Sequence, residues 1–339
     1  MDYALILGVP IGLLPVLIFL VVLRVMDSYR LVSIRYVIFV LVGGGLAAVA
    51  SYFINTFLLQ TFDLEYKQLT RYVAPVIEEC LKASIVIWLI HNHRIGFLVD
   101  AAIAGFATGA GFALVENFYY LQIQAIENPG VWIVRGFGTA IMHGGVTSIF
   151  AIASQLITER NMKINPLHFI PGLIAAIMLH SGFNHFFFSP ILHTTLVIII
   201  LPPIMYLVFE KSSASLHDWV ELDFDEDAYM LAQIDSGEFT DSKIGRFLTE
   251  LKDKFEGPIV VDMLCYLRLY TELALRAKGI LMMREAGMAP PIDDDIKSML
   301  EELKYLEQSI GKVGIITLTP FLHFTRKDLW QMYLLDQPR

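Results

Sequence analysis

Long apolar stretches constrain this chain more than any other feature of its sequence. They fall at about 3–24, 36–59, 71–90, 96–121, 131–157, 168–188 and 191–209, and each is long enough to cross a bilayer. In lipid the backbone polar groups must be satisfied within the segment, so such stretches cross as helices. Pro202 and Pro203 are expected to interrupt the last one. The sequence therefore predicts an all-α, polytopic membrane bundle of about seven transmembrane helices.

The composition changes after Glu210. Residues 1–210 hold 10 Lys and Arg against 11 Asp and Glu, whereas residues 211–339 hold 15 against 23. We therefore predict a membrane domain over 1–210 and an acidic, helical, soluble domain over 211–339, a composition that disfavours nucleic acid as a partner. Its expected helices cover about 226–236, 241–256, 258–285, 293–312 and 325–335. No catalytic motif is found there, which favours a regulatory or docking role.

The basic residues near the ends of the stretches predict the orientation. Seven of them fall on one side, namely Arg24, Arg30, Arg35, Arg94, Arg160, Lys163 and Lys211. Lys67 and Arg71 fall on the other. By the positive-inside rule the N-terminus lies outside and the C-terminal domain is cytoplasmic.

Ionisable side chains inside the third stretch conflict with its apolar character. Glu78, Glu79 and Lys82 precede a run that otherwise reads as a membrane helix. An ionised group costs about 2.5–3.5 kcal/mol at the centre of such a helix on insertion scales, so these residues point to function. Glu78 and Lys82 are four apart and are expected to share a face and neutralise each other. Glu79 then points about 100° away and is freer to act.

The next three stretches carry polar groups at a similar depth. They contribute Glu116 and Asn117, then His143, and then His180, Asn184 and His185. At about 1.5 Å per residue, all are expected in the outer half or near the middle of the bilayer, although the chain reverses direction each time. One shared cavity is the simplest interpretation. His180 and Asn184 are four apart and share a face, whereas His185 is rotated off it.

Two hydrolytic mechanisms suit these residues. In the first, Glu116, His143 and His180 hold Zn²⁺ with an open position for water, Glu79 is the general base, and Asn184 stabilises the oxyanion. In the second, a glutamate activates water without a metal and a histidine orients it. The sequence leaves both open, since the H-E-x-x-H signature of helical zinc proteases is not present. No G-x-S-x-G supports serine catalysis.

Four motifs on successive stretches resemble the PrsW family of intramembrane proteases, which is related to the CAAX prenyl-protein proteases and bacteriocin-immunity membrane proteases. They are "EECLK", "GAGFALVENFYY", the segment from Arg135 to His143, and "LHSGFNHF". The resemblance covers about residues 70–190 and leaves out the region after Glu210. In one respect the chain departs from the CAAX relatives, which place a Phe four residues before a key His. Here Phe137 lies six before His143.

The resemblance implies a bacterial cytoplasmic-membrane peptidase, classed as a metalloprotease, that cleaves single-pass or otherwise membrane-anchored proteins such as anti-sigma factors. By position, the implied active-site residues are Glu78, Glu79, Glu116, His143 and His180, with Asn184 in support. A cytoplasmic regulator acting through 211–339 is compatible with this function. The competing interpretations are a proton- or ion-coupled transporter, since intramembrane carboxylates also make proton relays, and an inactive relative that binds membrane proteins.

Overall fold

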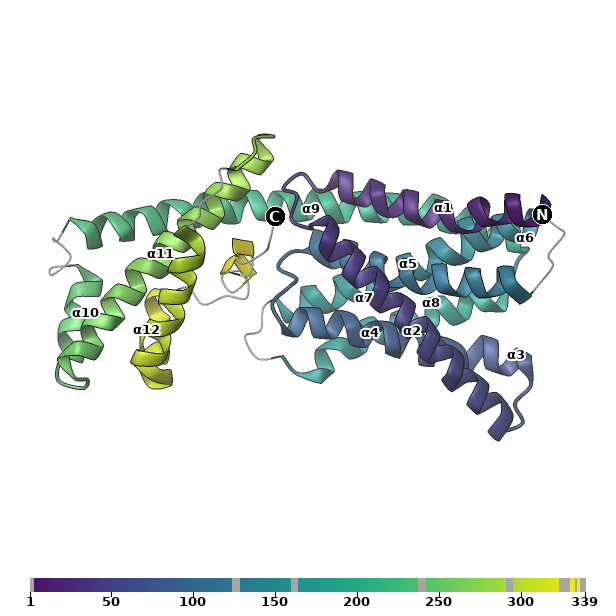
Figure 1. Ribbon diagram of the computed structural model, residues 1–339, viewed down its shortest axis with the longest axis horizontal. Coiled ribbons are helices and arrows are strands. Elements are labelled where there is room, and N and C mark those ends of the chain that lie inside the picture. The colour runs from purple at the N-terminus through teal and green to yellow at the C-terminus, as the bar shows by residue number, and fades with distance from the viewer. Residues whose placement is uncertain are drawn as a thin grey trace. The chain divides into compact units, whose positions relative to one another are not determined.

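A computed structural model describes residues 3–123, 129–159, 164–236, 242–290, 295–322, 330–332 and 334–335 (Figure 1). Every regular element within these ranges is a helix, as the apolar stretches predict. The chain forms two compact units, Met1–Ser213 and Ala214–Arg339.

The first unit is a bundle of long helices joined by short ones. Its elements are α1 (Tyr3–Met26), α2 (Ile34–Thr61), α3 (Tyr66–Gln68), η1 (Leu69–Val73), α4 (Ala74–His91), α5 (Leu98–Ile123), α6 (Pro129–Ile133), η2 (Val134–Thr139), α7 (Ala140–Thr158), η3 (Pro166–Phe169), α8 (Ile170–His185) and the first part of α9 (Pro190–Asp235). Helices η1 and η2 are π-helices, which sequence periodicity did not predict.

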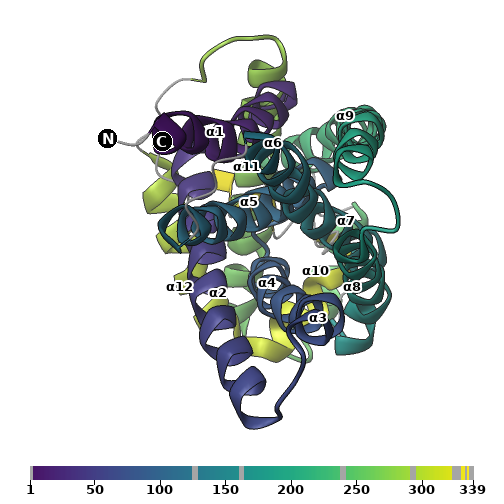
Figure 2. The same ribbon diagram turned by 90° about the vertical axis from the view of Figure 1, so that its right-hand side faces the viewer.

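Six helices in the described ranges are long and apolar enough to cross a membrane, which makes this a membrane protein. They lie at Gly8–Met26, Ile34–Thr61, Leu98–Gln122, Gly130–Thr158, Pro166–His185 and Pro190–Asp235. The seventh expected span, 71–90, forms η1 and α4, but its three ionisable residues keep it outside that apolar group. α4 nevertheless lies among the spanning helices in the view along the bundle (Figure 2).

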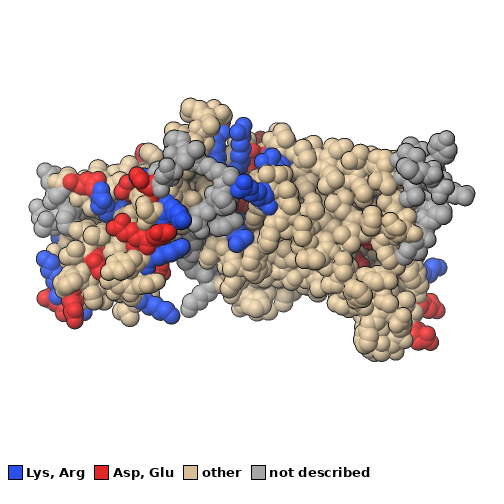
Figure 3. All heavy atoms as spheres, in the orientation of Figure 1, with Lys and Arg blue, Asp and Glu red and all other residues tan. Residues whose placement is uncertain are grey.

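Helices α5 and α7 form the centre of the bundle. In the most apolar segment of α5, 89% of the residues are buried. The corresponding segments of α1, α2, α8 and α9 are 17–39% buried. Glycines allow the close approach of α5 and α7: a Cβ on Gly105 would lie 2.6 Å from the carbonyl oxygen of Thr147. A Cβ on Gly144 would lie 2.6 Å from the ring of Phe106. The outer helices keep their apolar side chains on the surface, which shows few charges in Figure 3, as lipid requires.

The expected interruption at Pro202 and Pro203 is wrong, because α9 continues through both residues. Each proline removes one backbone donor, but in a membrane helix neighbouring contacts can compensate for this loss. Leu201 and Met205, on either side of the prolines, are almost fully buried. Their packing in the bundle explains why the helix axis is maintained.

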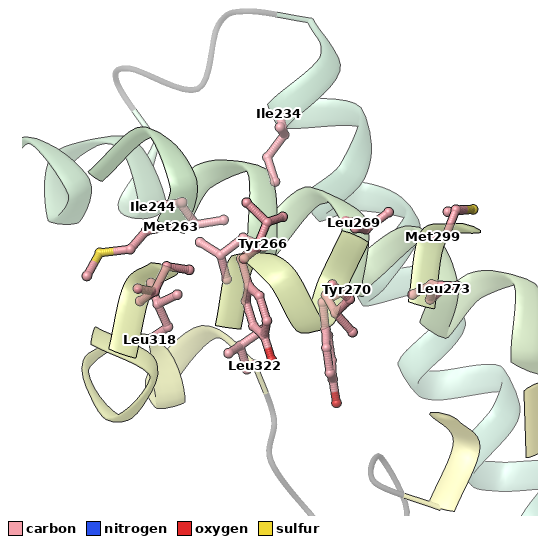
Figure 4. Packing of buried hydrophobic residues seen from close by; sticks show 14 of the residues in the cluster. Ile234, Ile244, Met263, Tyr266, Leu269, Tyr270, Leu273, Met299, Leu318 and Leu322 are labelled. Atoms are coloured by element: carbon pink, nitrogen blue, oxygen red, sulfur yellow. The ribbon is translucent and has the colours of Figure 1, made fainter. Parts of the chain in front are cut away.

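The second unit is also helical and has its own apolar core. It contains the rest of α9, followed by α10 (Lys243–Leu251), α11 (Gly257–Glu285), α12 (Asp295–Leu318) and η5 (Thr319–Phe321). A helix starting near 226 was expected, but that segment is the end of α9. Helix α12 runs six residues beyond the expected end at 312 and kinks at Gly311, whose φ is 71°. The core residues of α11, such as Tyr266, Tyr270 and Leu273, lie together in Figure 4.

Candidate active site

The polar residues inside the membrane meet at one end of the bundle, called the site end here. Helices α4 and α7 begin at this end, whereas α5 and α8 finish there. Residues early in α4 and α7 therefore lie at the same level as residues late in α5 and α8. This arrangement brings Glu78 and Glu79, Glu116, His143 and His180 into one network, as their predicted depths required.

A buried ion pair anchors the network. Glu79 Oε1 lies 2.5 Å from Lys82 Nζ and 2.7 Å from His180 Nδ1, and Glu79 and Lys82 are 2% and 0% exposed. The expected pairing of Glu78 with Lys82 is therefore wrong. Helical side chains lean toward the N-terminus, so the position three residues back is also within reach of a lysine. Glu79 is the carboxylate that faces α8 and the interior.

His143 connects this ion pair to α5. Its Nδ1 lies 3.1 Å from Lys82 Nζ, and its Nε2 lies 3.2 Å from Glu116 Oε2. The ring planes of His143 and His180 are perpendicular, with centroids 4.7 Å apart. Polar atoms of α4 and α5 thus contact His143, whereas those of α4 alone contact His180.

Arg135 is a site residue that we did not predict beyond its place in a motif. Its Nη2 lies 3.5 Å from Glu116 Oε1, and its Nε donates to Asn117 Oδ1 at 3.0 Å. The guanidinium lies 3.7 Å from the ring centre of Tyr120, and Asn117 Nδ2 donates to the carbonyl of Gly12 at 2.8 Å. The available signal was an arginine inside an apolar stretch.

Several of these groups face a cavity of about 650 Å³ that opens from the site end. Its polar lining includes Asn55, Glu78, Glu116, Arg135, Thr139, His143, His180 and Asn184, and its apolar lining includes Tyr52, Phe53, Phe112, Tyr119 and Phe186. Glu79 and Lys82 do not line this cavity; they lie behind it. The side chain of Glu78 is 14% exposed, and that of Glu116 is 26% exposed. These two carboxylates are therefore the ones that a molecule in the cavity can reach.

Of the two cavity-lining carboxylates, Glu78 and Glu116, Glu78 makes the weaker polar contacts. Its Oε1 lies 3.4 Å from Asn55 Nδ2, and its Oε2 lies 3.8 Å from His180 Nε2, which exceeds hydrogen-bonding distance. At this separation of 3.8 Å, both cavity-lining groups can accept hydrogen bonds from a bound molecule.

The last turns of α8 hold the π-helix η1. Asn184 Nδ2 donates to the carbonyl of Thr70 at 3.0 Å, and Ser181 Oγ donates to the carbonyl of Arg71 at 2.6 Å. Asn184 also lines the cavity. The hydrogen bond of Ser181 to η1 gives this residue a structural role. His185 Nδ1 contacts the carbonyl of Ser181 at 2.6 Å, consistent with its expected place off the His180 face.

The predicted zinc site can be tested against these donors. Glu78, His143 and His180 have ligand atoms within 4.8 Å of one another, so Glu78 takes the place expected for Glu116 in the most compact set. Two ligands about 2.1 Å from a tetrahedral zinc ion lie about 3.4 Å apart, close to the 3.8 Å between Glu78 and His180. His143 differs, because polar groups already occupy both of its nitrogens. Glu78 and His180 thus each have a ligand atom without a close hydrogen bond, whereas His143 would have to exchange one of its two contacts for the metal.

A lipid-embedded helical bundle with carboxylates and histidines around an open cavity has the architecture of a membrane-embedded hydrolase. The family model of the PrsW family intramembrane metalloproteases matches residues 32–208, more than half of the chain. The chain thus belongs to the PrsW family, and the matched region contains every site residue described above. No curated protein and no solved structure matches it. The first unit is accordingly an intramembrane protease domain.

Proposed function

We propose that this protein is an endopeptidase that hydrolyses membrane-anchored protein substrates, with Glu78 as the general base. The observation that carries the proposal is the pair formed by Glu78 Oε2 and His180 Nε2, 3.8 Å apart on the cavity wall. A water molecule between two acceptors can donate one hydrogen bond to each and present its lone pair to a carbonyl carbon. We first expected Glu79 to be the base, but its Oε1 is engaged by Lys82 and His180.

The proposed reaction balances with the residues present. Glu78 takes a proton from the water as its oxygen bonds to the scissile carbonyl carbon, and the carbonyl oxygen becomes an oxyanion. When the intermediate collapses, the C–N bond breaks and Glu78 returns the proton to the leaving amine. General acid–base catalysis of this kind contributes about 10²–10⁴-fold to a rate.

Arg135 is the proposed donor to the oxyanion. Its side chain lines the cavity, and its Nη2 makes no hydrogen bond; the contact of this atom with Glu116 Oε1, at 3.5 Å, is an ion pair. A fixed donor aimed at developing charge in a site that excludes water is a strong source of catalysis. Asn184, which we expected in this role, spends one amide hydrogen on Thr70 and retains the other for the substrate.

Zinc, when bound, would polarise the carbonyl and acidify its water. Glu78 and His180 offer suitable ligands, and His143 becomes a third only if Lys82 releases its Nδ1. The expectation that Glu116 is a ligand remains a prediction, since Glu116 is held by Arg135 and His143.

The position of the site supports a membrane-anchored substrate. The cavity opens at the site end, where α9 also begins, whereas the first unit ends at Ser213 after α9 has run the length of the bundle. With the orientation expected from the basic residues, the cavity faces the outside of a bacterial cytoplasmic membrane and residues 211–339 lie in the cytoplasm. We propose that the second unit selects substrates or receives a regulatory signal.

Comparing the N-termini of membrane proteins in cells that express the wild type or Glu78→Gln tests this function. We expect new N-termini in at least one membrane-anchored protein with the wild type, and none with Glu78→Gln or His180→Ala. Glu65→Gln is the matched control, because Glu65 is an exposed carboxylate at the same end. Equal cleavage by Glu78→Gln and the wild type would contradict the proposal.

A further inference from the structure

Lys82 lies at the centre of the polar network. It is fully buried, and its ammonium group contacts Glu79 Oε1 at 2.5 Å and His143 Nδ1 at 3.1 Å. The ammonium also lies 4.6 Å from the ring centre of Phe112. The salt bridge with Glu79 offsets part of the cost of burying this charge, and the contact with His143 satisfies a second proton of the ammonium group. This second contact also has a consequence for the histidine.

The charge of Lys82 determines which nitrogen of His143 carries the proton. An ammonium group can only donate hydrogen bonds, so His143 Nδ1 must accept. A neutral imidazole then bears its hydrogen on Nε2, which donates to Glu116 Oε2 at 3.2 Å. Neither nitrogen of His143 has a lone pair left for a metal ion or for water.

The same ion pair gives His180 the opposite tautomer. Glu79 Oε1 is a carboxylate acceptor, so His180 Nδ1 carries the hydrogen and donates to it at 2.7 Å. The Nε2 of His180 keeps its lone pair and lies 3.8 Å from Glu78 Oε2. His143 thus carries its hydrogen on Nε2 and its perpendicular neighbour His180 carries it on Nδ1, and both assignments follow from the Glu79–Lys82 pair.

We propose that Lys82 is a positioning residue that sets opposite tautomers on His143 and His180 and keeps His143 from ligating a metal. In the proposed function this reserves His180 for the catalytic water and uses His143 to hold Glu116. Only these catalytic consequences rest on the proposed function. The tautomers themselves follow from the hydrogen bonds and can be measured without a substrate.

Zinc affinity provides the first test. Glu79→Gln/Lys82→Met removes both charges of the pair, so the net charge of the site is unchanged, and the Gln oxygen can still accept from His180 Nδ1. Competition with a chromogenic chelator, using detergent-purified full-length protein, measures the dissociation constant for Zn²⁺. We expect the double variant to bind zinc at least about tenfold more tightly than the wild type, because His143 becomes a third ligand.

Removing His143 from both backgrounds gives the matched control. His143→Ala should leave the weak zinc binding of the wild type almost unchanged and should abolish the gain in the double variant. Equal affinities of the wild type and the double variant would overturn the proposal. An equal loss of affinity on removing His143 from either background would also overturn it, because His143 would then already be a ligand beside Lys82.

The second test measures the tautomers in the unmodified protein and uses single variants only to assign its signals. Nitrogen-15 spectra of histidine-labelled protein, assigned with His143→Ala and His180→Ala, distinguish the two tautomers directly. We expect His143 as the Nε2–H form and His180 as the Nδ1–H form. A His143 protonated on Nδ1 would overturn the proposal. The expected tautomers in a protein that cleaves nothing would support the role of Lys82 and refute only the protease function.

Discussion

Replacing Arg135 tests the proposed mechanism most directly. The guanidinium is fixed by Asn117 Oδ1 at 3.0 Å, by the ring of Tyr120 at 3.7 Å and by an ion pair between Nη2 and Glu116 Oε1 at 3.5 Å, while Nη2 makes no hydrogen bond. Arg135→Gln removes this donor. Loss of one donor to an oxyanion typically lowers kcat by about 10²–10³-fold, or about 2.7–4 kcal/mol. Because the donor acts on charge that exists only in the transition state, KM should change little.

Two further variants distinguish the donor itself from the side chains that hold it in place. Tyr120→Leu leaves the donor in place and removes the ring beneath it, which is worth about 0.5–2 kcal/mol, so a smaller fall in kcat is expected. Arg135→Lys keeps the charge but loses the planar group that reaches Asn117 and the cavity together, and should resemble Arg135→Gln. A steady-state cleavage assay with a substrate identified from the N-terminal comparison measures both constants.

The kcat and KM of Arg135→Gln decide whether Arg135 donates to the oxyanion. If Arg135→Gln retains more than about a tenth of the wild-type kcat, or if its whole effect lies in KM, Arg135 does not donate to an oxyanion. A thermal unfolding midpoint within a few degrees of the wild type is required of each variant, because Arg135 also contacts Glu116. A large drop in that midpoint for Arg135→Gln, matched by Arg135→Lys, would assign the residue to the structure of the site.

Three other predictions concern packing and support. Gly109→Val should destabilise the bundle by about 1–3 kcal/mol and abolish cleavage, because its Cβ would collide with the carbonyl oxygen of His143. Gly182→Ala is the control, because a Cβ at Gly182 would have nothing within 4 Å. Thermal unfolding measures the stability of each variant, and the cleavage assay measures its activity. Ser181→Ala should lower kcat without removing any group of the cavity lining, since η1 loses a hydrogen bond. Lys278→Met should lower the unfolding free energy of the second unit by about 3–5 kcal/mol, because it removes the ammonium group that donates to the buried Asp227 carboxylate at 2.6 Å. Denaturant unfolding should show recovery in Lys278→Met/Asp227→Asn, and no recovery would contradict this reasoning.

The membrane architecture was predictable because lipid restricts the choices. A span must satisfy its own backbone hydrogen bonds, so length and apolarity alone predict helices in the first 210 residues. Alternating direction then places residues early in one helix beside residues late in the next, which is why Glu116, His143 and His180 could be expected to meet. The ionisable residues of α4 attracted attention for a similar reason, since charge in lipid is costly.

Other features depended on contacts between helices. Pro202 and Pro203 are expected to break a helix, yet the buried neighbours Leu201 and Met205 maintain α9 through them. The π-helices before α4 and α7 also have no simple periodic signal, and η1 is held by Asn184 and Ser181 from a distant part of the chain.

The sequence by itself determined that this chain is a helical membrane protein with carboxylates and histidines at one level of the bilayer. It could not decide how those groups pair, because two glutamates 100° apart on one helix differ only in the neighbours that they face. The tertiary structure turns Glu79 toward Lys82 and His180 and leaves Glu78 on the cavity wall. Through these contacts it also decides which nitrogen of each histidine carries the hydrogen, a property set by the atoms around each ring and by no local pattern of residues.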